Sequence, residues 1–271
     1  MQFSFTDMIK ARRSVRTFDG KPVKEPDLKA LDAFIKTVSN PFNIPVEFRL
    51  LGADEFNLSS PVVLGSQLYL AAKVEGCENY EIGYGYSFEK ACLYAQSLGL
   101  GTVILAASIN RPEFEKAMDL KGKEVMPVAS PIGYPALKKS LRETIMRKGL
   151  KADDRLPFET LFFEGSFGRG LKKENAGVFS MALEMARWAP SAVNKQPWRA
   201  VVVGDTVHFY ELKTLNDSPI GDIQKLDMGI FLSHFDLTMK ESGEDGVFTH
   251  SDPGFPHEQN LKYIVSYSRT K

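Results

Sequence analysis

Hydrophobic residues recur along the first half of the chain with two alternating spacings, one helical and one typical of strands. Helical spacing predicts helices over residues 5–12, 28–38, 86–98 and 111–120. Short apolar runs bounded by Gly, Pro or Ser predict strands over residues 46–51, 67–74, 102–107 and 125–132. Gly99 is expected to end the long third helix, and Gly133-Tyr134-Pro135 to close the last strand.

The second half repeats the order of the first. A helix over residues 178–188, a loop and a strand over residues 199–203 follow one another as do their counterparts over residues 28–51. Two pairs of landmarks share an offset of 152 residues, Pro45 with Pro197 and Gly52 with Gly204. Two later pairs share an offset of 144 residues, Gly85 with Gly229 and Gly99 with Gly243. One insertion in the first copy, between its strand and its long helix, explains the change; a chance match of glycines is the alternative.

These repeats predict an internal duplication. We expect a first copy over residues 1–160 and a second, shorter copy over residues 161–271. The second copy is expected to lack a counterpart of the basic cluster at residues 12–16 and of the closing strand before Gly133.

The composition is that of a globular protein whose net charge is too small to attract polyanions. The chain has 271 residues, of which 43% are hydrophobic, and its 34 basic residues balance its 34 acidic ones. We therefore expect neither a nucleic-acid partner nor a membrane partner. The start, Met1 to Asp7, lacks the basic and apolar regions of a signal peptide, which favours a cytoplasmic location. The basic connector over residues 136–154 is expected to be a solvated face that carries Lys138, Lys139, Arg142, Arg147, Lys148 and Lys151.

Hydrolytic and metal chemistry have no motif in this sequence. The four histidines do not form HExxH, no CxxC or GxSxG occurs, and no metal site is expected. His208 is expected at an exposed strand position and His234 in the core, while Cys77 and Cys92 are interpreted as structural. The segment Gly83-Tyr84-Gly85 lacks the third glycine of a dinucleotide fingerprint and is not interpreted as one.

Two segments have compositions that suit a ligand. The cluster Arg12-Arg13-Ser14-Val15-Arg16 places three guanidinium groups and a hydroxyl within five residues, which suits a phosphate. Its alternative is a solvated basic turn. The segment Trp188 to Trp198 combines two prolines with Ser191, Asn194 and Gln196, which suits a flat heterocycle; its alternative is a rigid connector with a packed Trp.

Three motifs together resemble the flavin-dependent nitroreductase superfamily. They are Arg-x-Ser-x-Arg near the start, Gly-Leu-Gly-Thr over residues 99–102, and Ala-Pro-Ser-x-x-Asn-x-Gln-Pro-Trp over residues 189–198. The resemblance implies an α+β fold, FMN held at the interface of two copies, and transfer of electrons from NAD(P)H to nitroaromatics, quinones or related acceptors. Here 174 residues separate the first and last motifs, so the chain resembles the fused, pseudo-dimeric subfamily. We therefore expect a monomer with one site between its two copies, the loop over residues 40–45 being a degraded counterpart.

The resemblance also assigns roles to residues. Arg12 and Ser14 match phosphate and ribityl contacts, with Arg13 beside them, and Arg16 matches the cation near flavin N1 and O2, which makes Arg16 the candidate catalytic residue. From the other copy, Ser191 and Asn194 match ligand contacts, and Pro190 and Ala192 lie against the ring. Arg155 resembles a phosphate contact and Lys151 is a further candidate for it. The backbone amides of Leu105, Ala106 and Ala107 would approach flavin N5, although the Glu-Gly of some relatives is missing there.

The resemblance thus predicts an FMN-dependent NAD(P)H oxidoreductase whose flavin carries the redox chemistry. The alternative is a degenerate relative that binds or stores FMN without turnover. A third possibility is a small-molecule or protein-interaction module without flavin, in which the arginine cluster has no ligand. The sequence names neither the acceptor nor the preferred nicotinamide.

Overall fold

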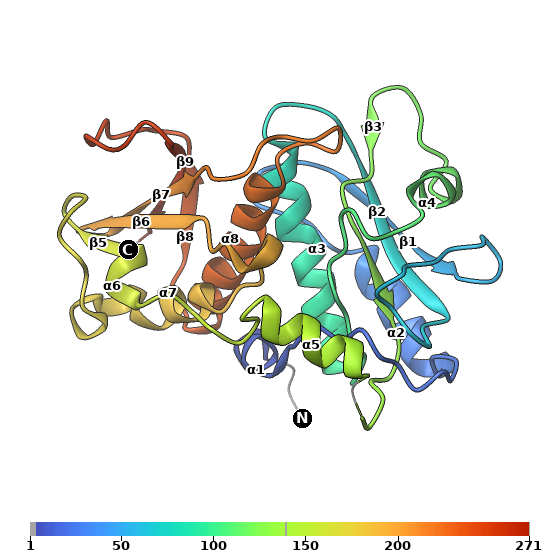
Figure 1. The fold of residues 1–271 in the computed structure, drawn as a ribbon. Coiled ribbons are helices and arrows are strands. Elements are labelled where there is room, and N and C mark those ends of the chain that lie inside the picture. The colour runs from blue at the N-terminus through green and yellow to red at the C-terminus, as the bar shows by residue number, and fades with distance from the viewer. Residues whose placement is uncertain (1–3, 139, 271) are drawn as a thin grey trace.

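Two β-sheets flank a central pair of long helices in the computed structural model, which describes residues 4–138 and 140–270 (Figure 1). The helices are α3 (Tyr80–Ser97) and α8 (Ile223–Glu241), and they pack against each other along the middle of the molecule. The mixture of helices and sheets is the α+β class expected from the resemblance. None of the helices in the described residues has the length and hydropathy to cross a membrane.

The first copy supplies the sheet beside α3. Its central strand β2 (Leu68–Glu75) pairs antiparallel with β1 (Val46–Gly52), β3 (Glu124–Val125) and β4 (Ala129–Ile132). The same copy has the helices α2 (Glu25–Ile35), α4 (Arg111–Ala117) and α5 (Leu141–Gly149), and α1 (Phe5–Ala11), which packs against α3 and α8.

The second copy supplies the sheet beside α8, with strand order β5-β6-β7-β9-β8. Its strands are β5 (Phe162–Glu164), β6 (Trp198–Val203), β7 (Thr206–Leu212), β8 (Gly246–Thr249) and β9 (Leu261–Arg269). β5 runs parallel to β6 and the other pairs are antiparallel. The helices are α6 (Phe158–Leu161) and α7 (Ser180–Arg187), with short 3₁₀ turns over Lys173–Asn175, Gly177–Phe179 and Ala192–Asn194.

The two long helices cross at a reciprocal pair of glycines. A Cβ on Gly85 would lie 2.1 Å from the carbonyl oxygen of Leu226, and a Cβ on Gly229 would lie 2.1 Å from that of Ile82. The offset of 144 residues that relates the glycines also relates Ile82 to Leu226, so the contact has pseudo-twofold symmetry. Both helices are followed by a glycine with positive φ, Gly99 and Gly243, as the same offset predicts.

The copies are more alike at their ends than the sequence predicts. β9 pairs with β7 as β4 pairs with β2, so the second copy does have a closing strand and its expected absence was wrong. The prediction of a single insertion, in the first copy alone, was also wrong. Residues 53–67 join β1 to β2, whereas residues 204 and 205 alone join β6 to β7. In the opposite sense, residues 213–222 precede α8 and only residues 76–79 precede α3. Each copy therefore carries one insertion.

Two predicted strands are interrupted because a side chain takes their hydrogen bonds. Residues 102–107 form isolated bridges instead of a strand, and residues 125–132 divide into β3 and β4. The guanidinium of Arg111 donates to the carbonyl oxygens of Ala106, Met126 and Pro127, which a regular ladder would otherwise use. Pro127 also lacks an N–H for the ladder.

Two further helical predictions change. α3 begins at Tyr80, so Gly83 and Gly85 lie inside the helix at its contacts with neighbouring segments. The basic connector is not a purely solvated face, because it contains α5, whose Glu143 and Arg147 are buried. Lys139, from the same connector, lies outside the described residues.

Candidate functional site

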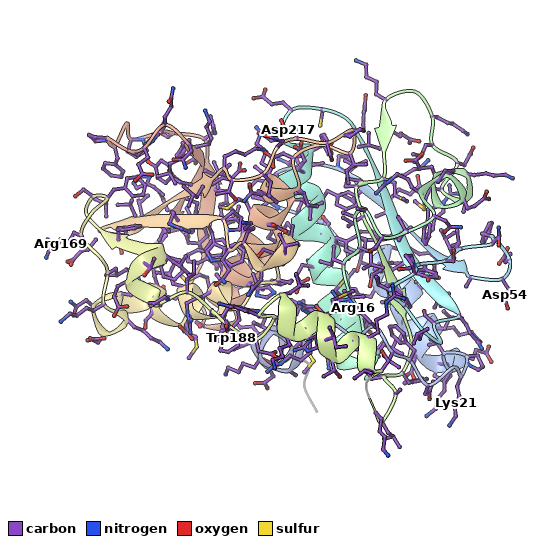
Figure 2. The ribbon with its side chains drawn as sticks, viewed as in Figure 1. Arg16, Lys21, Asp54, Arg169, Trp188 and Asp217 are labelled. Atoms are coloured by element: carbon purple, nitrogen blue, oxygen red, sulfur yellow. The ribbon has the colours of Figure 1, made fainter. Side chains whose placement is uncertain are left out.

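A cavity of about 450 Å³ lies between the two copies. The first copy contributes the segment after α1, the stretch over residues 103–108 and the inner side of α5. The remaining wall comes from the segment that follows α5, the loop after α7 and the first turns of α8. Figure 2 shows Arg16 and Trp188, which both line this cavity, on the side of the molecule where α5 lies.

Arg12 begins the cationic part of the wall, immediately after α1 ends. Its Nε lies 3.1 Å from Glu89 Oε1, and the two side chains are 6% and 0% exposed. Glu89 Oε1 also lies 2.9 Å from His234 Nε2, and His234 Nδ1 lies 3.1 Å from the Met185 carbonyl oxygen. His234 is thus a satisfied core residue, as predicted. Arg12 Nη1 is buried and, among the described residues, has no hydrogen-bond partner.

Arg155 adds a second guanidinium that is only partly satisfied. It donates to the carbonyl oxygens of Ala152 and Trp188, both at 3.1 Å, and its guanidinium lies 5.4 Å from the centre of the Trp188 ring. Its buried Nε has no partner among the described residues. Burial, followed by the positive charges of Arg12 and other nearby arginines, lowers the pKa of Arg155 to about 10. A bound anion would relieve this repulsion.

Arg16 and Arg147 form another pair of cavity-lining cations. Burial lowers the pKa of Arg16, Glu143 raises it and the nearby Arg147 lowers it further. Arg147 donates to the Ser14 carbonyl oxygen at 3.3 Å and forms an ion pair with Asp153. The Nε of Arg16 is buried without a partner among the described residues.

The opposite wall is a loop held in an unusual backbone conformation. Val193, Asn194 and Gln196 have φ values of 44°, 56° and 50°, in the left-handed region. Asn194 Nδ2 donates to the carbonyl oxygens of Lys151 and Asp154, at 2.7 and 3.2 Å. The backbone N–H of Gln196 donates to Ser191 Oγ at 2.9 Å. Hydrogen bonds within the loop and to the segment after α5 thus hold this conformation.

The structure brings together nearly all of the predicted site residues. The cavity is lined by Arg12, Arg13, Ser14, Arg16, Leu105, Ala106, Ala107, Arg155, Pro190, Ser191, Ala192 and Asn194. Lys151 does not line it. That residue lies in a neighbouring surface depression, and its contribution is the carbonyl oxygen that holds Asn194. The ligand contacts of all these residues stay predictions.

Sequence reasoning missed several residues of the wall. Arg147 was assigned to a solvated face, yet Ser140 and Glu143 have the spacing of a helix-capping box, and Ser140 Oγ does accept the Glu143 amide. Asp227 was not singled out, although it is an acid on a face of α8 whose other cavity residues are Ile223 and Ile230.

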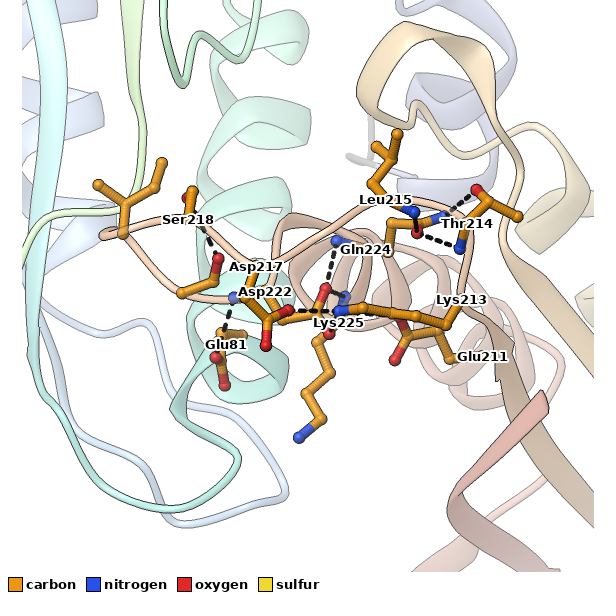
Figure 3. Close-up of polar contacts among 12 residues, drawn as sticks. Glu81, Glu211, Lys213, Thr214, Leu215, Asp217, Ser218, Asp222, Gln224 and Lys225 are labelled. Atoms are coloured by element: carbon orange, nitrogen blue, oxygen red, sulfur yellow. Dashed lines mark hydrogen bonds and ion pairs between the residues drawn. The ribbon is translucent and has the colours of Figure 1, made fainter. Parts of the chain in front are cut away.

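Asp227 is a buried acid that forms no ion pair with a cation among the described residues. Its side chain accepts the Ala192 amide at 2.9 Å and the residue is 3% exposed. Burial raises the pKa of Asp227 well above its ordinary range; the hydrogen bond from the Ala192 amide lowers it, and the negative charges of Asp222 and Glu211 raise it. Figure 3 shows Asp222 and Glu211 near Lys213 at the start of α8. Burial raises the pKa of Glu211 itself to about 7.

In the first copy, the residue equivalent to Asp227 is Gly83, and the space beside Gly83 is filled by other side chains. A Cβ on Gly83 would lie 2.7 Å from Ile44 Cβ and 3.2 Å from Asn40 Oδ1. Asn40 Oδ1 accepts the backbone amides of Phe42 and Ile44, and Asn40 Nδ2 donates to Ser87 Oγ of α3 at 3.0 Å, so the loop over residues 40–45 lies against α3. This packing agrees with the interpretation of that loop as a degraded counterpart.

Comparison with known proteins identifies the fold. A family model described as "Putative TM nitroreductase" matches residues 4–239. A "putative nitroreductase" from Thermotoga maritima is 20% identical, with a TM-score of 0.65 over 99% of this chain and 94% of that chain. A nitroreductase family protein from Clostridium novyi is 20% identical, with a TM-score of 0.43 over 53% of this chain and 91% of that chain. An FMN-dependent nitroreductase from Clostridium difficile is 14% identical, with a TM-score of 0.42 over 49% of this chain and 88% of that chain. No curated protein matches this sequence.

Proposed function

Because the chain belongs to this nitroreductase family of oxidoreductases, we propose that it uses FMN to carry electrons from NADH or NADPH to a small organic acceptor. The proposal includes the redox partners, which are a nicotinamide donor and an acceptor such as a nitroaromatic or a quinone. It also includes a cytoplasmic location. A monomeric state is part of the proposal as well, since both walls of the cavity come from one chain.

The observation that carries the proposal is a set of buried guanidinium nitrogens without partners beside one cavity. Arg12 Nη1, Arg16 Nε and Arg155 Nε are buried, and none has a hydrogen-bond acceptor among the described residues. A buried charged donor left without an acceptor costs about 1–3 kcal/mol or more. A phosphate offers the acceptor oxygens that the donors of Arg12 and Arg155 need, so this part of the cationic wall fits the phosphate end of FMN, while the Arg16 donor is assigned to the ring.

The other wall fits a flat, uncharged ring. Pro190 and Ala192 present small apolar surfaces from a loop that its own hydrogen bonds fix. A rigid wall lowers the entropy lost when a ligand is ordered against it. Because the Asn194 amide nitrogen is already bonded to two carbonyl oxygens, its proposed ligand contact is through Oδ1.

In this proposal the chain binds the phosphate of FMN, positions its ring and stabilises the negative charge that develops on it. Arg12, Arg155 and Ser14 hold the phosphate, with Arg13 at the rim, and the amides of residues 105–107 face the reacting edge of the ring. A bound flavin supplies hydride acceptance and electron transfer. Arg16 places a fixed positive charge where negative charge develops, and in a site that excludes water such a charge stabilises strongly.

The test is an FMN titration of the purified chain, followed by absorbance and tryptophan fluorescence. We expect one FMN per chain, and riboflavin to bind at least tenfold more weakly because it lacks the phosphate that would bind the arginines. Arg155→Ala should weaken FMN binding by a similar factor. Arg169→Ala is the matched control, because Arg169 lies at the far edge of the molecule with an exposed side chain (Figure 2).

The outcome also separates the alternatives. Bound FMN that NADH or NADPH reduces, and that an added quinone or nitroaromatic reoxidises, supports the oxidoreductase. Bound FMN that neither nicotinamide reduces would favour FMN binding or storage without turnover. Protein that binds no FMN would reject both.

A further inference from the structure

We propose that Asp227 is an uncharged acid that donates a hydrogen bond to the ligand at the end of the cavity away from Arg12. The inference rests on the proposed function, in that the ligand is an organic phosphate with a heterocyclic ring. It adds a residue of the ring end to the site, together with the protonation state in which that residue acts.

The position of Asp227 relative to the cationic wall follows from α8. Asp227 and Ile230 line the cavity, and His234 lies further along the same helix, where its Nε2 contacts the Glu89 carboxylate that pairs with Arg12. Asp227 and His234 are seven residues apart, which is about 10 Å along a helix axis. Asp227 therefore lies about 10 Å along α8 from the residue that contacts the carboxylate paired with Arg12. A phosphate joined to a heterocycle through a short polyol has this separation of anionic and uncharged parts.

The surroundings of Asp227 favour its protonated form. Its one hydrogen bond among the described residues comes from the Ala192 amide, and no ion pair among them includes Asp227. The charged groups that act on it, Asp222 on its own helix and Glu211 on β7, are both acidic. The cations that face the cavity come from the segments after α1 and α5 and from α5 itself. Burial raises the pKa of Asp227 most, the hydrogen bond from the Ala192 amide lowers it, and the two acidic neighbours raise it, so that the net direction is upward.

A protonated carboxyl group can donate one hydrogen bond, and in Asp227 that donor can point into the cavity. Because Asp227 Oδ2 accepts the Ala192 amide, the proton is assigned to Oδ1. Asp227 lines the cavity, so its hydroxyl is available to a carbonyl oxygen or an unprotonated ring nitrogen of the ligand. An ionised Asp227 would instead repel the same lone pairs.

The other copy supports a ligand role for this position. The offset of 144 residues that pairs Gly85 with Gly229 pairs Gly83 with Asp227. In the first copy Ile44 packs over Gly83, where a side chain would clash. The acid thus occurs at the open cavity, and a glycine occurs where the equivalent space is filled.

The experiment compares FMN affinity across pH in wild type, Asp227→Asn and Asp227→Ala, using fluorescence titration of the full chain. Asn can accept the Ala192 amide and donate into the cavity whatever the pH, so it mimics the uncharged acid. At about pH 5.5 we expect Asp227→Asn to bind FMN within threefold of wild type and Asp227→Ala to bind about tenfold more weakly. As pH rises, wild type should lose at least tenfold relative to Asp227→Asn, because the donor becomes an anion.

The ratio of wild-type to variant affinity is the informative quantity. The FMN phosphate has its own ionisation near pH about 6, and that effect cancels in the ratio. Asp54→Asn is the matched control, since Asp54 is exposed at an edge of the molecule far from Arg16 and Trp188 (Figure 2), and its ratio should stay near one. Thermal unfolding of each variant without FMN establishes that it is folded, and Asp227→Asn should gain stability over wild type as pH rises.

Two outcomes would overturn the inference. A ratio that does not change with pH would mean that Asp227 acts through its bond to the loop and that its charge does not matter to the ligand. Stronger FMN binding by wild type than by Asp227→Asn at high pH would mean that the ionised form binds. Loss of FMN binding by wild type itself would instead overturn the proposed function, and this inference with it.

Discussion

Replacing Glu89 with Gln tests the buried network that holds the cationic wall. Glu89 is completely buried and its Oε1 lies 3.1 Å from Arg12 Nε and 2.9 Å from His234 Nε2. Gln keeps the size and one acceptor oxygen but removes the negative charge. Arg12 would then be a buried cation without a counter-ion, and breaking a buried ion pair costs about 3–5 kcal/mol. Because the amide oxygen retains one hydrogen bond, we expect about 3 kcal/mol.

The assay is urea unfolding at neutral pH without ligand. With an m-value of about 3 kcal/mol/M, a loss of about 3 kcal/mol lowers the midpoint by about 1 M. Glu47→Gln is the matched control, because Glu47 is 52% exposed and pairs with Arg49 on the surface, and its second partner, Lys73, keeps the closer carboxylate of Glu124. Such an exposed pair contributes about 0–1 kcal/mol.

FMN provides a second measurement on the same variant. If Arg12 contacts the phosphate, the ligand supplies the missing counter-charge, so FMN should stabilise Glu89→Gln more than it stabilises wild type. A loss below about 1 kcal/mol, equal to that of Glu47→Gln, would refute the reasoning, since it would mean that Arg12 and Glu89 do not act as a buried ion pair.

Three further predictions address stability, packing and redox chemistry. The pKa of Glu211 is raised to about 7 in the folded chain, so its folded form resists ionisation and wild type should lose stability between about pH 4.5 and 7. Glu211→Gln should abolish that loss, which is at most about 3 kcal/mol in pH-dependent urea unfolding. Gly229→Ala places a Cβ against the backbone of α3 and should cost about 3 kcal/mol, whereas Gly149→Ala, with open space around its Cβ, should change stability by less than about 0.5 kcal/mol. Arg16→Ala should lower the reduction potential of bound FMN and slow its reduction by NADH or NADPH by about 100-fold, while Lys21→Ala, exposed and outside the cavity lining, should leave both unchanged.

Elements with a strong local signal could be predicted from the sequence. The helix over residues 5–12 and the strand over residues 46–51 differ from α1 and β1 by a residue at one end. The first long helix was recognised, and the glycines that served as landmarks of the duplication, Gly85 and Gly229, lie at the contact between α3 and α8. α3 nevertheless begins at Tyr80 because Gly83 and Gly85, which weaken an isolated helix, allow close packing of neighbouring segments.

Other features depend on contacts between distant residues. α5 turns Glu143 inward, where its carboxylate accepts the Arg16 amide and the Thr17 hydroxyl. In α5 the charged residues Glu143 and Arg147 therefore face the protein, while the apolar residues Leu141 and Ile145 face solvent. An ordinary surface helix has the opposite arrangement. In the site, motifs located the arginine cluster and the Pro-Ser loop. They did not locate Asp227, because its environment comes from β7 and from a loop far from it in sequence.

The cavity whose two walls belong to one chain has a consequence for dilution. In a dimer assembled from separate subunits, the fraction of complete sites falls once the protein concentration drops below the dissociation constant of the pair. Here the peptide link between the copies keeps each wall at a fixed effective concentration near the other, whatever the amount of protein in solution. FMN affinity and turnover per chain should therefore be the same at nanomolar and at micromolar protein.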